Sequence, residues 1–84
     1  MSDYGQRIWD AIMLRGLTVA EFAEEAGVER HTLVGVLKGT EKPTEAFGGL
    51  VEAAIERLPA NGLSRAENEE RLLARAAEAM NDND

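Results

Sequence analysis

The fold is decided by the stretch VAEFAEEAGVERHTLVGVLKG, residues 19–39. Two short helices that meet at a steep angle need a small residue where they touch. They also need a residue that tolerates a left-handed backbone at the turn. Ala23 and Gly27 meet these two requirements. Apolar residues stand where the helices would cross, namely Phe22, Val28, Leu33 and Val36. The pattern therefore predicts a helix-turn-helix.

Start and stop signals predict five helices along the whole chain and no strand. Polar residues suited to capping a helix N-terminus precede four of them, at Asp3, Thr18, Thr44 and Ser64. Gln6 and Glu67 complete a capping box with the first and the last of these residues. The helices are expected at residues 4–14, 19–26, 29 or 30 to 38, 45–58 and 64–80. Pro59 ends the fourth helix, because proline cannot continue it.

The 84 residues are enough for one domain, because two cores within that length would each be too small to offset chain entropy. The predicted organisation is a helix-turn-helix domain at 1–58, a short connection at 59–63, a C-terminal helix at 64–80 and a frayed tail at 81–84. The aromatic residues expected in the core are Trp9, Phe22 and Phe47.

The C-terminal helix has a narrow apolar stripe that is rich in alanine. Its members are Ala66, Leu72, Leu73, Ala76, Ala77 and Met80. Such a stripe has two interpretations. The helix packs on its own domain, or it pairs with its copy in a homodimer.

The composition is acidic, since 16 Asp and Glu against 9 Lys and Arg give a formal net charge of −7. Residues 31–58 carry a formal charge of only −1, against −3 for the segment on either side. An acidic body repels phosphate at long range. Any contact with nucleic acid is therefore expected from the middle of the chain.

No cysteine is present, which excludes disulfides and thiolate metal sites and fits a reducing cytoplasm. His31 is the only histidine, and no serine or cysteine stands at a recognisable catalytic spacing from it. We therefore expect no enzyme, no metal and no cofactor. The N-terminal residues lack the pattern of a signal peptide, and no window approaches the roughly 20 apolar residues that cross a bilayer. A cytoplasmic protein without membrane association is expected.

The sequence resembles the phage-repressor and Cro family of helix-turn-helix domains, the XRE type, from about Ile8 to Leu58. The pieces that carry the resemblance are Arg15-Gly16-Leu17-Thr18, then Phe22-Ala23 with Gly27-Val28, then Leu37-Lys38-Gly39 leading to Lys42-Pro43-Thr44. In this order and spacing they imply an all-α, five-helix domain of that type.

The resemblance implies a sequence-specific DNA-binding transcriptional regulator, a repressor of phage or prophage type, that binds double-stranded DNA as a homodimer. It puts Arg30, His31 and Gly35 on the groove-facing side of the third helix. Arg30 would then reach a guanine edge, and His31 a base or a phosphate. The remaining DNA-binding candidates, near the backbone of the duplex, are Thr18, Lys38 and Lys42.

In a second hypothesis, the protein has the same fold but a different function. The groove-facing surface would then bind a host protein, as an adaptor or an inhibitor, with little or no DNA binding. The residues that motivate it, together with the net charge of −7, are Val19, Glu29, Val34 and Gly35. That family commonly has glutamine at the first of these positions, serine or threonine at the second, and polar or basic residues at the last two. In simpler interpretations, His31 is an ordinary exposed residue. Arg30, Lys38 and Lys42 are then the positive part of a surface that carries charges of both signs. The glutamates at 21, 24 and 25 form a solvated helix face or a docking patch for a basic partner.

Overall fold

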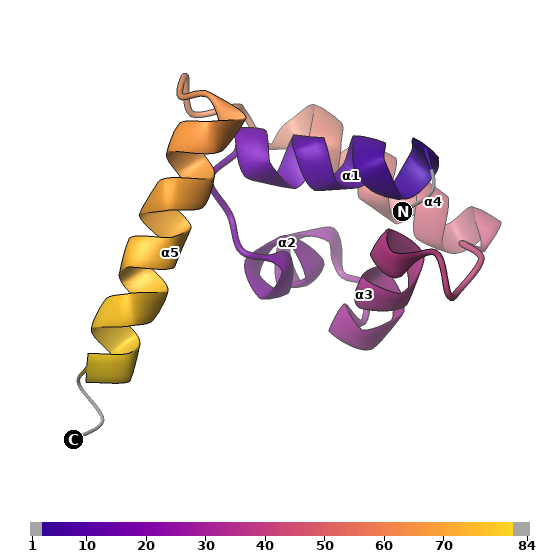
Figure 1. Ribbon diagram of the computed structural model, residues 1–84. Coiled ribbons are helices and arrows are strands. Elements are labelled where there is room, and N and C mark those ends of the chain that lie inside the picture. Colours follow the sequence, from indigo (N-terminus) through magenta and orange to yellow (C-terminus); the bar gives the residue numbers. More distant parts are fainter. Residues whose placement is uncertain (1–2, 82–84) are drawn as a thin grey trace.

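The computed structural model describes residues 3–81, with side chains for residues 3–77, and the described chain is all-helical (Figure 1). Its elements are α1 (Asp3–Leu14), α2 (Val19–Ala26), α3 (Arg30–Lys38), α4 (Glu45–Arg57) and α5 (Arg65–Asn81). The all-α prediction is confirmed, and each predicted helix is found within one or two residues of its expected ends. Residues 82–84 of the predicted tail lie outside the described residues.

Three of the four predicted N-caps are present as hydrogen bonds. The hydroxyl of Thr44 accepts from the backbone N–H of Phe47 at 3.1 Å. Ser64 and Glu67 form the expected capping box at the start of α5. Thr18 also forms a full box, because the carboxylate three residues on, at Glu21, accepts from its backbone N–H at 2.9 Å.

The capping box predicted for the first helix is wrong. Asp3 is already inside α1, so it lies in the first turn and not at the N-cap. The side-chain amide of Gln6 donates to Asp10 at 2.9 Å and does not reach back to the helix start. The negative charge of Asp3 therefore lies in the first turn, where it interacts favourably with the positive N-terminal end of the helix dipole.

The corner between α2 and α3 forms as the sequence predicts. Gly27 has φ +74° and ψ 28°, a left-handed conformation, and ends α2. Val28 then donates its backbone N–H to the carbonyl of Ala23 at 3.0 Å. This hydrogen bond closes the turn as in a Schellman motif. The chain therefore reverses within three residues, and α3 starts at Arg30.

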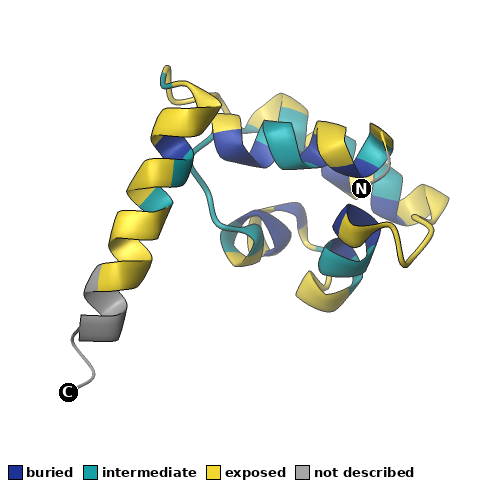
Figure 2. Ribbon diagram, in the orientation of Figure 1, coloured by how far each residue is buried: buried dark blue, intermediate teal, exposed yellow. Residues whose placement is uncertain are grey.

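The core is one apolar cluster enclosed by α1 to α4. Its buried members are Ile8, Ile12, Met13, Phe22, Ala23, Ala26, Leu33, Val36, Leu37, Phe47, Val51 and Ala54. The predicted core residues Phe22 and Phe47 are among them, whereas Trp9 is only partly buried and packs against the edge of the cluster. Trp9 lies beside α5, which covers only one end of α1 (Figure 2).

Arg15 ties the end of α1 to the end of α4. Its guanidinium donates to the carbonyls of Ala11, Ile55 and Leu58 at 2.7, 2.8 and 2.8 Å. Two of these carbonyls belong to the last turn of α4, where the helix itself supplies no donor. Arg15, which is part of the sequence resemblance, thus has a structural role.

The apolar stripe of α5 is covered by its own domain only in part. Leu72 packs partly against the core, but Leu73 is 71% exposed and the alanines of the predicted stripe are exposed. The buried residue of α5 is Asn68, at 1% exposure. The reason is visible in Figure 1, where α5 meets the rest of the molecule near its N-terminus and then projects away from it. The side chain of Met80 lies outside the described residues.

Within residues 3–81, no helix has both the length and the apolar character that a membrane span requires.

Candidate functional site

The helix α3 has one face in the core and one face toward solvent. Leu33, Val36 and Leu37 are buried, because they recur at three-and-four spacing on the inner side. The outward positions hold Arg30, His31, Val34, Gly35 and Lys38. The charged residues among them, Arg30 and Lys38, are exposed, as is His31.

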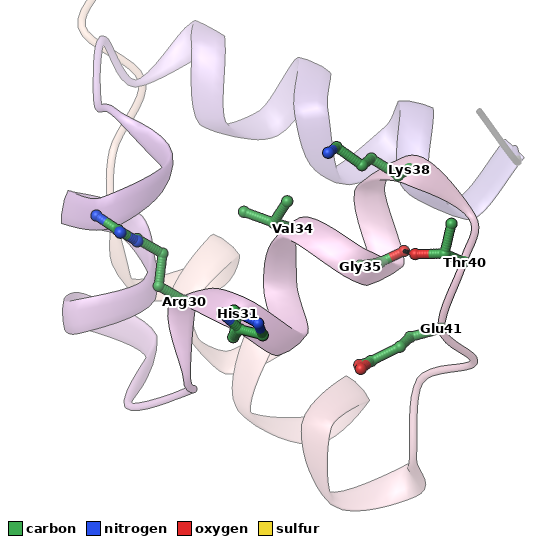
Figure 3. A pocket seen from close by; sticks show the side chains of 7 residues that line it. All are labelled: Arg30, His31, Val34, Gly35, Lys38, Thr40 and Glu41. Atoms are coloured by element: carbon green, nitrogen blue, oxygen red, sulfur yellow. Dashed lines mark hydrogen bonds between the residues drawn. The ribbon is translucent and has the colours of Figure 1, made fainter.

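These outward residues line a surface hollow of about 470 Å³ (Figure 3). Thr40 and Glu41, from the loop that follows α3, complete its lining. The hollow therefore brings together three of the five DNA-binding candidates, Arg30, His31 and Lys38. We call the surface formed by Arg30, His31, Val34, Gly35 and Lys38 the α3 face.

The other two candidates lie outside the hollow. Lys42 is exposed and follows Glu41 in the loop. Thr18 is half-buried at the start of α2, where its hydroxyl accepts from the backbone N–H of Glu21 at 3.0 Å. Its own N–H donates to the Glu21 carboxylate, so both groups serve the capping box.

The carboxylate of Glu21 occupies the N-terminal end of α2. The hydrogen bond from the Thr18 backbone lowers the pKa of Glu21, and further lowering comes from the Thr18 hydroxyl and from Arg75. Arg75 lies 3.8 Å from this carboxylate, so a residue of α5 reaches the start of α2. An anion is therefore already present at this helix N-terminus, where a phosphate would otherwise be favoured.

The cations on and beside the α3 face have no acidic partner in the described chain. Elsewhere on the surface, four arginines pair with carboxylates: Arg7, Arg57, Arg65 and Arg75. None of the described carboxylates lies within 4.0 Å of Arg30, Lys38 or Lys42. These three charges are therefore available to an external anion.

Glu41 is the residue of the hollow that sequence reasoning missed. The carbonyl of Gly35 accepts from the backbone N–H groups of Thr40 and Glu41 at 2.9 and 3.1 Å, and from the Thr40 hydroxyl at 3.2 Å. These bonds draw the loop back over α3. A Cβ at Gly35 would stand 3.0 Å from Cγ of Glu41, so the glutamate lies where a side chain of residue 35 would otherwise extend. The signal in the sequence was a glycine at an outward helix position.

No family model, curated protein or solved structure matches the chain. Within the described residues, no group of three or more His, Cys, Asp or Glu side chains is arranged to hold a metal ion.

Proposed function

We propose that the protein is a sequence-specific DNA-binding regulator that places α3 in the major groove. The observation that carries the proposal is the α3 face, an exposed helix surface with Arg30, His31 and Lys38 and no acidic partner for its cations. The nine residues of α3 span about 14 Å. The major groove, about 12 Å wide, admits a helix.

We assign each cation a proposed DNA contact from its position on or after α3. Arg30 is the first residue of α3, and residues at the start of a recognition helix reach base edges. Its guanidinium would bind guanine O6 and N7 bidentately, and His31 beside it would donate to a base or phosphate. Lys38 and Lys42, at and beyond the end of α3, would contact phosphates and fix the register.

The regulator would act as a repressor of the phage type, as the resemblance of its motifs implies, and as a homodimer through α5. An apolar hollow of about 350 Å³ between α1 and α5 supports the second point. It is lined by Trp9, Met13, Glu69, Leu72 and Leu73. A second copy of the chain that covered Leu73 would bury apolar surface that the monomer leaves in water.

Duplex DNA from upstream of the protein's own gene tests the proposal by fluorescence anisotropy at low salt. Arg30→Ala is expected to weaken binding by about 1–3 kcal/mol and to relax specificity at one base pair. Arg71→Ala removes the same charge from an exposed position of α5, and should change affinity far less. Absence of binding by the folded wild-type protein at low salt would exclude DNA binding.

One observation favours a protein partner instead. Carboxylates of Glu21 and Glu41 stand at the start of α2 and over the α3 face, two places that a duplex would approach. A host protein bound there would be recovered stoichiometrically in a pull-down, would remain after nuclease treatment and would be lost with Val34→Asp. Loss on nuclease treatment would count against this second candidate.

A further inference from the structure

Glu41 is an acidic group held in place on an otherwise cationic surface. Its backbone N–H is anchored to the carbonyl of Gly35 at 3.1 Å, and its Cβ, Cγ and carboxyl carbon all lie close to where a Cβ of residue 35 would stand. In Figure 3 the side chain extends from its loop toward the part of α3 that carries His31. The carboxylate therefore lies over the α3 face, because the backbone of its loop is bonded to Gly35.

The charge of Glu41 is not neutralised by a neighbour. None of the described cations lies within 4.0 Å of its carboxylate, although it shares the hollow with Arg30 and Lys38. The side chain is exposed, so its carboxylate faces anything that enters the hollow. Any duplex docked on the α3 face brings phosphates close to this charge.

We propose that Glu41, seated on Gly35, is a specificity-determining residue that weakens binding to duplex DNA of arbitrary sequence. The inference rests on the proposed DNA-binding function. Non-specific binding depends almost entirely on phosphate contacts, whereas specific binding adds contacts to base edges. A carboxylate that repels phosphate lowers the affinity for every duplex. At a site where a base edge donates a hydrogen bond to that carboxylate, as cytosine N4 does, this bond offsets the repulsion. The ratio of specific to non-specific affinity therefore rises.

Gly35 has a defined part in this arrangement. It lies within α3 at an ordinary helical conformation, where alanine is otherwise the better residue. A methyl group there would stand 3.0–3.2 Å from three carbon atoms of Glu41. Gly35→Ala therefore shifts the Glu41 side chain by a few tenths of an ångström without changing the net charge of the protein.

The test measures binding of a random-sequence duplex of about 20 base pairs by fluorescence anisotropy, between about 50 and about 200 mM salt. Glu41→Gln is expected to raise the non-specific affinity about three- to tenfold. The slope of log affinity against log salt concentration should steepen by up to about 0.9, which is the contribution of one phosphate contact. Gly35→Ala should raise the affinity in the same direction. Glu70→Gln is the control for charge, because α5 lies on the far side of α2 from α3 (Figure 1).

The outcomes separate the two proposals. Equal effects of Glu41→Gln and Glu70→Gln, with measurable binding by the wild-type protein, would overturn the role of Glu41 and leave the DNA-binding proposal standing. Failure of every variant to bind any duplex at low salt, with folding verified by circular dichroism, would overturn both. Binding of the random duplex by Glu41→Gln, under conditions in which the wild-type protein binds only its specific site, would support the inference most directly. If Gly35→Ala fails to fold, Glu41→Gln against Glu70→Gln still decides the question.

Discussion

The side-chain amides of Asn61 and Asn68 are joined by two reciprocal hydrogen bonds. Asn61 donates to Asn68 at 2.8 Å, and Asn68 donates to Asn61 at 3.1 Å. The pair lies against Gly16, where a Cβ would stand 2.6 Å from the Asn61 amide nitrogen. Because the Asn61 backbone N–H also donates to the carbonyl of Leu14, this polar contact fixes the start of α5 to the end of α1.

Asn68→Ala is expected to destabilise the protein by about 1–3 kcal/mol, because it removes both hydrogen bonds between the amides at a buried position. Urea denaturation followed by circular dichroism measures the change. Asn61→Ala should have a comparable effect, and the double variant should cost less than the sum of the two. Additive effects would show that the two amides do not act as a pair.

Two glycines are expected to respond to alanine with opposite signs. Gly27 has a positive φ and open space around its missing Cβ, so Gly27→Ala costs only the left-handed backbone, about 1–2 kcal/mol. Gly49 lies within α4, also with open space at its Cβ position. Gly49→Ala is expected to stabilise by about 0.4–1 kcal/mol. Thermal unfolding of both variants beside the wild-type protein checks the signs, and a loss of stability from both would contradict the argument.

The corner between α2 and α3 was predictable because its determinants are local. The small residue at 23 and the left-handed glycine at 27 are four residues apart, and the cap at 18 acts on a backbone N–H three residues along the chain. The resemblance, and not the helical periodicity, put Arg30, His31 and Gly35 on one side of α3, and the structure brings these residues together with Lys38 in the hollow.

The features that escaped prediction depend on how the loops fold back on the helices and on which helices pack together, and helical periodicity does not indicate either. An apolar stripe indicates which face of α5 is hydrophobic, but not whether the same chain covers it, so the sequence left the burial of Leu73 open, and Leu73 is exposed. Asn68 is buried because its partner comes from the preceding connection. Glu41 enters the α3 face because the loop after α3 folds back on Gly35.

The capping box at the start of α2 predicts a pH dependence. The pKa of Glu21 is lowered below its ordinary value of 4.5 by the hydrogen bond from Thr18. The stabilisation from its carboxylate is therefore present in full above that ordinary value, and is lost as the pH falls through the lower value of the folded state. Glu21→Gln keeps the geometry of a capping box but cannot titrate.

The melting temperatures of the wild-type protein and Glu21→Gln, compared across this range, measure the effect. The wild-type advantage should be constant above pH 4.5 and should shrink as the solution becomes more acidic. Other carboxylates whose pKa is lowered, such as Asp10 beside Arg65, titrate in both proteins and cancel in the difference. An advantage that persists unchanged into strong acid would contradict the assignment.

Leu73 tests the homodimer. Its side chain is 71% exposed beside the apolar hollow between α1 and α5, so a twofold partner seated there would bury it. Burial of a leucine contributes about 1.5–3 kcal/mol, and Leu73→Gln should therefore weaken dimerisation about tenfold or more. Sedimentation equilibrium over a range of concentrations measures the dissociation constant.

Leu50→Gln is the matched control for that experiment, because Leu50 is also exposed, at 46%, but lies on α4 away from the hollow. Both substitutions replace a largely solvated leucine, so each should leave the stability of the monomer nearly unchanged. A selective loss of the dimer with Leu73→Gln locates the interface at α5. A wild-type protein that stays monomeric at every concentration, or an equal loss from both variants, would remove α5 from the interface.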